Sequence, residues 1–332
     1  MGKPSTSTTM PQLTPYNHPN YHHHPKPFPP EYASAWGKDR YGIWIELDFF
    51  GVTQRFRWIP AGRFTMGSAP TEAERYNDEA LHEVTLTTGF WLADTACTQA
   101  LWQAVMGANP SQFKESEQQP VDSVSWLEVQ QFLVKLSQAY SGLVLSLPTE
   151  AQWEYACRAG TTTPFSFGET ITTEQVNYNG NYPYANGVKG AYREKTVAVK
   201  SLPANGWGLY EMHGNVWEWC MDEWREDLGL TSVTNPVHVQ TLDRIEASLS
   251  LEQTGVLPLG ILANAGDDSV ARVLRGGSWG NGGRDCRSAV RSFGTASLRS
   301  SLHGFRFVLG HELQYGAVQM PAASPIGRDQ KQ

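Results

Sequence analysis

Cysteine is the residue type best suited to redox or soft-metal chemistry in this 332-residue chain. The four cysteines, Cys97, Cys157, Cys220 and Cys286, form no CxxC pair and have no zinc-finger spacing. Two disulfides are possible, but we expect buried reduced thiols, because the first thirty residues lack the basic start and apolar run of an export signal. Cysteine spacing alone therefore predicts no metal centre and no redox motif.

Other catalytic motifs are also missing from the sequence. His82 and Glu83 are adjacent but do not continue into HExxH, and there is no phosphate-binding glycine loop or GxSxG elbow. We therefore assign no catalytic residue. We expect the acidic residues of one short run to lie in a solvated loop: Glu72, Glu74, Asp78 and Glu79.

The segment from Arg275 to Arg306 is the most informative part of the chain. It reads RGGSWGNGGRDCRSAVRSFGTASLRSSLHGFR. The 24 residues from Gly280 to His303 contain no Lys, Glu, Gln, Met or Trp, although these five types make up 67 of the 332 residues. Every residue type present can be encoded by a codon ending in C, whereas those five types cannot. Randomising AAC codons at their adenines would produce this pattern.

This composition predicts a binding surface carried on a fixed frame. We expect one set of residues to hold the frame through hydrogen bonds to loop carbonyls: Arg284, Arg287, Ser288, Ala289, Arg291 and Arg299. We expect another set to face solvent and bind the ligand: Gly280, Asn281, Gly282, Asp285, Val290, Ser292, Phe293, Gly294, Leu298, Ser300, Ser301, Leu302 and His303. Among these, Phe293, Leu298 and Leu302 would form a small apolar patch surrounded by Gly and Ser, a chemistry similar to that of antibody paratopes.

The bulk composition is typical of a soluble globular protein, with 40% hydrophobic and 18% charged residues. The net charge of −7 makes nucleic acid an unfavourable partner, so we expect none. No run approaches eighteen apolar residues, so we expect no membrane span and a cytoplasmic protein. Twelve Trp and 31 Gly together indicate a loop-rich fold with an aromatic core.

Hydrophobic periodicity predicts the elements that must position these residues. Alternating apolar residues from Ile43 to Leu47 predict a half-buried strand, and two further strands are expected over 56–59 and 64–66. Ser125 begins a helix with a capping-box pattern, and Thr149 begins another. A third, short helix is expected over residues 98–106, ended by Gly107.

Composition also divides the chain into regions. We expect residues 1–40 to be a disordered Pro- and His-rich segment, residues 41–312 to form the folded domain, and residues 313–332 to be a disordered tail. Within the domain, residues 222–271 have no strong period and are expected to form an insertion or a long loop. Residues 275–306 are the variable region.

Several motifs together resemble the formylglycine-generating-enzyme family, also called sulfatase-modifying factors. They are RFRWIPAGRFTMGS (55–68), PVDSVSW (120–126), LSLPTEAQWEYACRAG (145–160), NGWGLYEMHGNVWEWC (205–220), and the flanking RGGSW and GFRF. Within that family the chain is most similar to variable proteins of diversity-generating retroelements. The resemblance implies an α+β, C-type-lectin-like fold with short antiparallel strands, two main helices and many irregular loops.

The resemblance implies one leading function and two alternatives. The leading function is binding of a protein or other macromolecule by a hypervariable surface. The first alternative is a formylglycine-generating oxidase, and the second is a noncatalytic accessory member of the family. In the oxidases two cysteines follow the GGS-aromatic motif, whereas here the corresponding residues are Asn281 and Cys286. Because Cu(I) requires paired sulfur ligands, the missing thiol argues against the oxidase.

The resemblance also implies a calcium site, although ligand binding itself requires no cofactor. Glu211 and Glu218 would supply carboxylates, and Gly214 and Val216 would supply backbone carbonyls, which are ligands that suit Ca²⁺. The alternative is that Glu218 caps a turn and Glu211 is solvated. His213 lies within the same turn and is expected to be a hydrogen-bonding spacer rather than a base.

Overall fold

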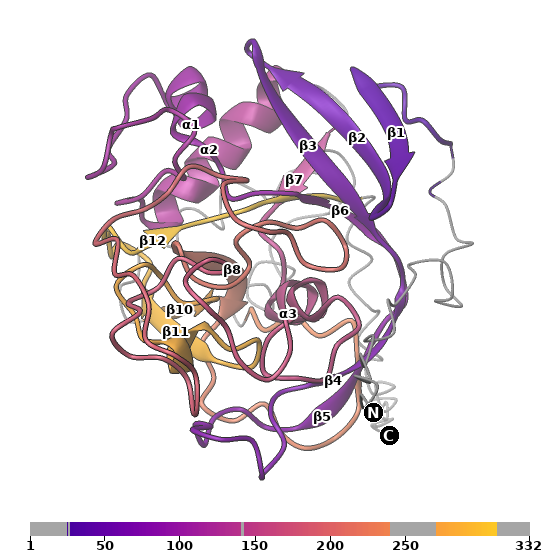
Figure 1. The fold of residues 1–332 in the computed structure, drawn as a ribbon. Coiled ribbons are helices and arrows are strands. Elements are labelled where there is room, and N and C mark those ends of the chain that lie inside the picture. The colour runs from indigo at the N-terminus through magenta and orange to yellow at the C-terminus, as the bar shows by residue number, and fades with distance from the viewer. Residues whose placement is uncertain (1–24, 26, 141–142, 240–269, 311–332) are drawn as a thin grey trace, which may run out of the picture.

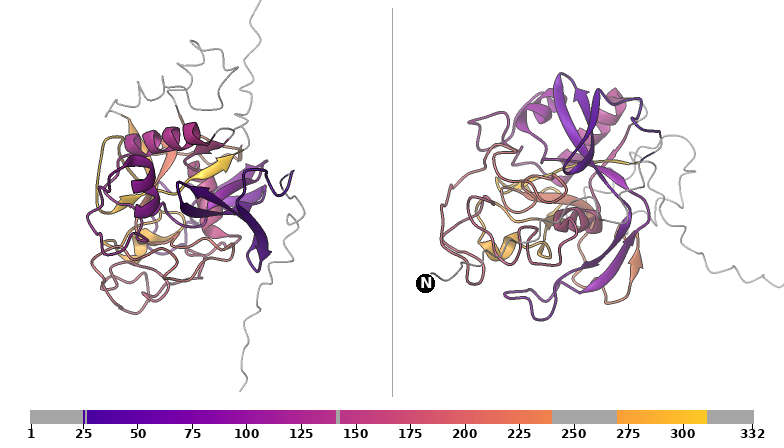
Figure 2. Two further views of the ribbon diagram at one scale, coloured as in Figure 1. Left: turned by 90° about the horizontal axis from the view of Figure 1, so that it is seen from above. Right: turned by 45° about the vertical axis from the view of Figure 1, so that its right-hand side comes forward.

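The computed structural model describes residues 25, 27–140, 143–239 and 270–310 (Figure 1). Residues 1–24 of the expected N-terminal segment, residues 240–269 of the expected insertion and the tail over 313–332 lie outside the described residues. The described part has a mixed α+β architecture, as predicted. Helices α1 and α2 lie together at one end, away from the irregular chain between α3 and β8 (Figures 1 and 2).

A six-stranded sheet forms the first layer, in the order β1-β2-β3-β6-β13-β7. Its strands are β1 (Ala35–Asp39), β2 (Gly42–Phe49), β3 (Val52–Ile59), β6 (Phe90–Ala93), β13 (Val308–Gly310) and β7 (Val144–Ser146). The strand expected from the alternation after Tyr41 is β2. Strand β1 pairs antiparallel with β2, so the expected domain boundary at residue 41 is too late.

Two smaller sheets complete the strand structure. The first has the order β11-β10-β8-β12, formed by β11 (Arg291–Thr295), β10 (Ala271–Arg275), β8 (Trp217–Glu223) and β12 (His303–Gly304). The second has the order β4-β5-β9, formed by β4 (Gly62–Met66), β5 (His82–Leu86) and β9 (Val233–Thr234). Residues 222–271 were expected to form an insertion or a long loop. That range is too broad, because it contains the end of β8 and the whole of β9.

The three predicted helices are present, and the capping boxes predicted at Ser125 and Thr149 are formed. Helix α1 (Gln99–Met106) begins after Thr98 and ends at Gly107, whose left-handed φ of 84° suits glycine. Helices α2 (Trp126–Ala139) and α3 (Glu150–Arg158) each begin with a complete capping box. No helix in the described ranges has the length and apolar content needed to cross a membrane.

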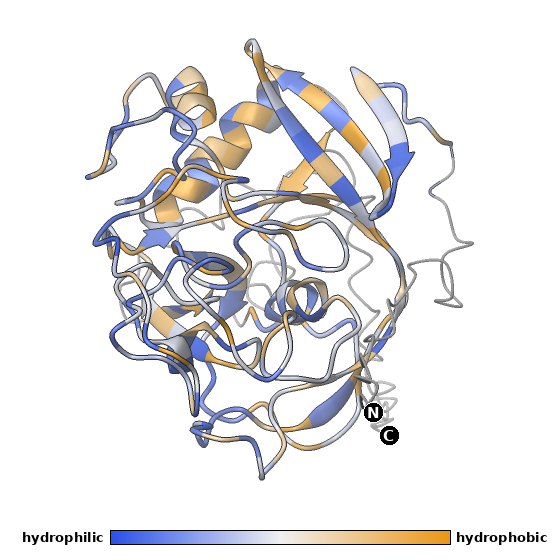
Figure 3. Ribbon diagram, viewed as in Figure 1, coloured by the Kyte–Doolittle hydropathy of each residue, from blue (hydrophilic) through white to orange (hydrophobic). Residues whose placement is uncertain are grey.

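Aromatic side chains fill the core, as the composition indicates. Trp126, Trp153 and Trp219 are fully buried, and Phe132 stacks on Trp102 with ring centroids 5.3 Å apart. Figure 3 shows hydrophobic residues concentrated along α2 and alternating with hydrophilic residues on β2 and β3. The core therefore supports both the long sheet and the four-stranded sheet that carries the variable region.

Candidate ligand-binding surface

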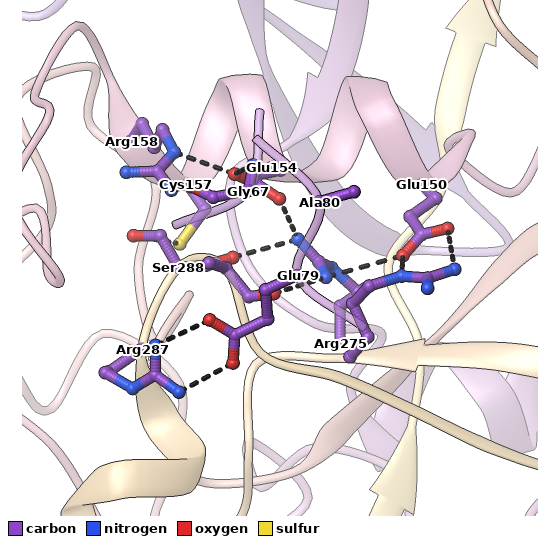
Figure 4. A network of polar contacts seen from close by, with 12 residues as sticks. Gly67, Glu79, Ala80, Glu150, Glu154, Cys157, Arg158, Arg275, Arg287 and Ser288 are labelled. Carbon is purple, nitrogen blue, oxygen red and sulfur yellow. Dashed lines mark hydrogen bonds and ion pairs between the residues drawn. The ribbon is translucent and has the colours of Figure 1, made fainter. Parts of the chain in front are cut away.

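Buried arginines fix both ends of the variable region. The guanidinium of Arg275 donates hydrogen bonds to the carboxylate of Glu154 and to the carbonyl oxygens of Ser288 (2.9 Å) and Ala289 (3.1 Å) (Figure 4). At the other end, Arg306 donates to both carboxylate oxygens of Glu218, at 2.7 and 2.8 Å. The segment is therefore anchored before Gly276 and after Phe305.

Two further arginines anchor the interior of the segment. Arg287 is fully buried and donates two hydrogen bonds to Glu79 (2.6 and 2.9 Å) and one to Glu72 (2.6 Å), as Figure 4 shows for Glu79. Arg291 binds both oxygens of Glu150, at 2.6 and 3.0 Å. The predicted hydrogen bonds to loop carbonyls are also present, from Arg287 to Arg284 and Glu74 and from Arg291 to Asp78 and Arg225, and the carboxylate partners add to them.

The prediction of a solvated acidic run holds for Glu74, which is exposed, but is wrong for Glu79. Glu79 is fully buried, because the buried guanidinium of Arg287 requires a counter-charge. Burial opposes ionisation of Glu79, but the hydrogen bonds and charge of Arg287 outweigh it and lower the pKa of the carboxyl. The loop that contains this run is thus part of the frame of the variable region.

The other two predicted frame arginines lie nearer the surface. The Nε atom of Arg284 donates to the carbonyl of Glu74 at 2.7 Å, and its guanidinium lies 3.7 Å from the ring centroid of Tyr76. Arg299 differs from the prediction, because its exposed guanidinium pairs with Glu128 at 2.7 Å rather than with a loop carbonyl. Such an exposed pair contributes little to stability.

Most predicted ligand-binding residues are accessible. Phe293 is 54% exposed and Leu298 is 39% exposed. Phe293 lies on β11, the edge strand of its sheet. Others are half-buried: Gly280, Asn281, Gly282, Asp285, Ser292, Ser300, Ser301 and Leu302.

Three predicted ligand-binding residues are buried, so their assignment to the solvent face is wrong. Val290 is 2% exposed and belongs to the main hydrophobic core. Gly294 is buried, and a Cβ atom there would lie only 3.0 Å from the ring of Trp219. His303 lies in β12 and pairs with Trp217 of β8, and its ring centroid lies 5.4 Å from that of Trp219. Strand pairing fixes the positions of Gly294 and His303, whereas Val290 precedes β11 and is held by packing in the core.

The predicted apolar patch also needs correction at one member. Leu302 is half-buried and packs against the main core, so it contributes partly to stability. Trp224, outside the variable region, takes its place, because its ring lies 4.7 Å from that of Phe293. The accessible apolar surface consists of Phe293, Leu298 and the edge of Trp224.

The sequence did not predict two residues that border the surface. Tyr182 is 67% exposed, and its carbonyl oxygen accepts a hydrogen bond from the Gly283 amide at 2.8 Å. Trp224 follows strand β8, and its ring packs against that of Phe293. Tyr182 lies in a turn-rich stretch without periodicity, and the contact of Trp224 depends on tertiary pairing, so neither had a local signal.

The cysteines are all free and buried, which confirms the expectation of reduced thiols. Burial raises the pKa of Cys157 to about 12 and that of Cys286 well above its ordinary value. The side chain of Asn281, which occupies the place of the first oxidase cysteine, accepts hydrogen bonds from Trp217 Nε1 (2.9 Å) and Ser278 Oγ (2.6 Å). Within the described ranges, no cluster of three or more His, Cys, Asp or Glu side chains could hold a metal ion.

His213 is a buried hydrogen-bonding spacer, as predicted. Its Nδ1 lies 2.7 Å from the carbonyl oxygen of Cys286, and its Nε2 lies 2.9 Å from Ser166 Oγ. Burial lowers the pKa of His213 to about 4, so the ring is neutral at pH 7. His213 therefore connects the turn that contains the predicted calcium site to the variable region without carrying charge.

The carboxylates of the predicted calcium site are both buried. Glu218 accepts hydrogen bonds from Arg306 and from Trp153 Nε1 (2.7 Å), so its charge is already compensated. Glu211 accepts only from the backbone amides of Lys200 and Leu202, and burial raises its pKa to about 7. Neither a turn-capping Glu218 nor a solvated Glu211 matches the structure, and calcium binding stays a prediction.

Comparison with known proteins places this architecture in a family. The model of the sulfatase-modifying factor enzyme 1-like domain matches residues 52–310. Formylglycine-generating enzyme from Streptomyces coelicolor is 30% identical over 264 residues, covering 75% of this chain and 73% of that protein. The mouse enzyme is 29% identical over 180 residues, covering 50% of this chain and 46% of that protein, so the chain spans about half the length of the first curated relatives it matches.

A solved structure shows the same fold. Variable protein 1 of Treponema denticola superposes with a TM-score of 0.62 and 26% sequence identity, covering 80% of this chain and 98% of that chain. The fold is thus the α+β, C-type-lectin-like fold that the motifs imply. Because the family model covers most of the residues, the chain belongs to the sulfatase-modifying factor enzyme 1-like domain family.

Proposed function

We propose that this chain binds a protein or other macromolecule through residues 280–303, as the variable protein of a diversity-generating retroelement. One observation carries the proposal: buried Arg287 and Arg291 are anchored by carboxylates outside the segment, while Phe293 and Leu298, which follow them in the chain, are exposed. The frame therefore does not depend on the exposed side chains. The likeness to variable protein 1 of Treponema denticola supports this reading.

The chemistry of the surface favours a macromolecular ligand. An exposed aromatic ring and an exposed leucine lie among small Ser and Gly residues, which combine apolar contact with adaptable hydrogen bonding. The exposed and half-buried candidate residues are spread over residues 280–302. A broad, shallow surface of this kind suits the contact area of a protein partner.

The DNA around the gene tests the proposal. A retroelement would place a reverse-transcriptase gene nearby, together with a near-copy of codons 280–303 that is rich in adenine. Closely related isolates would then differ at these codons while the codons for Arg287 and Arg291 stay the same. Identical codons in all isolates and the absence of a near-copy would contradict the proposal.

The curated relatives are formylglycine-generating enzymes, which keeps the oxidase as the second candidate. Two features weigh against it: Asn281 replaces the first thiol, and Cys286 is fully buried with a raised pKa. Incubation with Cu(I), oxygen and a cysteine-containing sulfatase peptide, followed by mass spectrometry, separates the candidates. Aldehyde formation that disappears in Cys286→Ala would favour the oxidase, whereas a noncatalytic accessory member would give no product and no codon variation.

A calcium ion held by Glu211 and the carbonyls of Gly214 and Val216 is part of the proposal. The buried Glu211 carboxylate, with backbone amides as its hydrogen-bond donors, fits a hard cation. Glu218 is already held by Arg306, so it would have to share its carboxylate. The ion would supply a structural cross-link in this turn and no chemistry.

A further inference from the structure

The thirteen candidate binding positions do not have equal freedom to vary. We propose that five of them determine specificity and can accept most side chains: Gly280, Ser292, Phe293, Leu298 and Ser301. Four others belong to the frame despite lying within the variable stretch: Asn281, Val290, Gly294 and His303. This inference rests on the proposed function, because it names which side chains of that surface select the ligand.

Asn281 is a frame residue because its side chain completes buried hydrogen bonds. Its Oδ1 accepts from Trp217 Nε1 at 2.9 Å and from Ser278 Oγ at 2.6 Å, and its carbonyl oxygen accepts from the Asn179 amide at 2.8 Å. Trp217 and Ser278 are buried. A side chain without an acceptor would leave the indole N–H of Trp217 without this partner, which is costly in a buried site.

Val290 and His303 are frame residues because they pack in the core. Val290 is 2% exposed and contributes to the cluster that contains Trp219. The ring of His303 packs edge-on against Trp219, and burial lowers its pKa to about 4. A larger or charged side chain at either position would disturb a densely packed interior.

Gly294 is a frame residue because a Cβ atom there would be crowded against a buried ring. The added carbon would lie 2.7 Å from Leu298 Cδ2 and 3.0 Å from Trp219 Cη2. Leu298 can move because it is exposed, but Trp219 is fully buried. The adjacent Phe293 points to the opposite face of β11, where its side chain is 54% exposed.

The five specificity positions lack such constraints. Ser292 lies on the same face of β11 as Gly294 but is half-buried, Ser301 is half-buried in a turn, and Phe293 and Leu298 are 54% and 39% exposed. A Cβ atom on Gly280 would approach only the flexible end of Leu302, at 3.1 Å. These positions lie on both halves of the segment, which meet where Gly280 lies against Leu302.

The remaining four positions can vary, but their neighbours limit which side chains they accept. Asp285 accepts a hydrogen bond from the Tyr76 hydroxyl at 2.8 Å, and Ser300 Oγ accepts one from the Leu302 amide at 3.2 Å. Leu302 packs against the core, and a Cβ atom on Gly282 would lie 3.2 Å from that of Tyr182. These positions should accept small or similar residues.

Matched pairs of substitutions test the division, with thermal unfolding of the full chain as the measurement. The pairs place the same new residue at a free and a frame position two or three residues apart: Ser292→Asp with Gly294→Asp, Ser301→Asp with His303→Asp, and Phe293→Ser with Val290→Ser. We expect each free member to lower Tm by less than about 2 °C and each frame member by more than about 5 °C.

Every outcome bears on the inference. A frame variant that fails to fold supports it, and the milder Val290→Ala and His303→Gln should then fold with a measurable loss of Tm. Equal shifts within the pairs, or a free variant that fails to fold, would overturn it. The proposed function is tested separately. If it is wrong, codons 280–303 will be invariant among isolates, whatever the Tm values of the paired variants show.

Discussion

Single residues in the variable region differ in how strongly they are held, and the arginines show the range. Arg287 and Glu79 are both fully buried and paired, whereas Arg299 and Glu128 pair at the surface. A buried pair stabilises only while both partners are present, because either one alone is a charge without compensation in the interior. The same residue type therefore serves as an anchor at one position and as a solvated side chain at another.

Removing the charge of Glu79 tests the anchor. We expect Glu79→Gln to lower the free energy of unfolding by about 3–5 kcal/mol, because Arg287 stays buried with only Glu72 as a carboxylate partner. Urea unfolding measures the change. Glu128→Gln is the matched control and should cost at most about 1 kcal/mol, since its partner Arg299 is exposed. Equal losses in both variants would contradict the assigned role of Glu79.

The exposed apolar residues should matter for binding rather than for folding. We expect Phe293→Ala combined with Leu298→Ala to leave Tm within a few degrees, because changes on the solvent side usually cost under about 0.5 kcal/mol. Capture of the natural partner, once the partner is identified by cross-linking, should be lost. Phe50→Ala is the control, because Phe50 is 52% exposed but lies between β2 and β3. A large loss of stability in the double variant would show that these side chains belong to the core.

At the scale of elements, Asp222 connects helix α3 to the chain after β8. Its Oδ2 accepts the amide of Glu150 at 2.6 Å, and its Oδ1 accepts the amide of His238 at 2.8 Å. The carboxyl is fully buried next to Glu150, and burial followed by the charge of Glu150 raises its pKa to about 7. The helix terminus is thus bound by an acid that resists ionisation.

This raised pKa predicts a pH dependence of stability. A carboxyl with a higher pKa in the folded state binds its proton more tightly there, so its contribution is complete at low pH and decreases as the pH rises towards about 7. We expect the unfolding free energy of wild type to fall relative to that of Asp222→Asn as the pH rises from 4 to 7. Urea titrations at several pH values measure it. Parallel pH profiles for the two proteins would contradict the prediction.

The elements divide into those that the sequence predicts and those that it cannot. Thr98, Ser125 and Thr149 are caps, and their signals lie within four residues, so all three helices were predicted. The burial of Glu79 depends on Arg287, which lies 208 residues away, so no local pattern could indicate it. The inward positions of Val290 and Gly294 depend likewise on the pairing of β11 with β10 and on the core behind it.

At the scale of the whole molecule, the proposed calcium ion would stabilise the native fold. A ligand that binds only the folded state raises its stability by mass action, by about 2.7 kcal/mol at a hundred times Kd. We therefore expect removal of calcium with a chelator to lower Tm, and added Ca²⁺ to restore it. Glu211→Gln should be insensitive to both treatments. An identical Tm with chelator and with Ca²⁺ in wild type would eliminate the site.

The position of strand β13 has a genetic consequence. This strand follows the variable region directly and lies inside the six-stranded sheet, between β6 and β7. A nucleotide gained or lost during copying of codons 280–303 would shift the reading frame and replace β13 with unrelated sequence. Such products could not complete the six-stranded sheet. Under the proposed function, β13 would therefore be kept by substitutions in codons 280–303 and lost by changes that shift the reading frame.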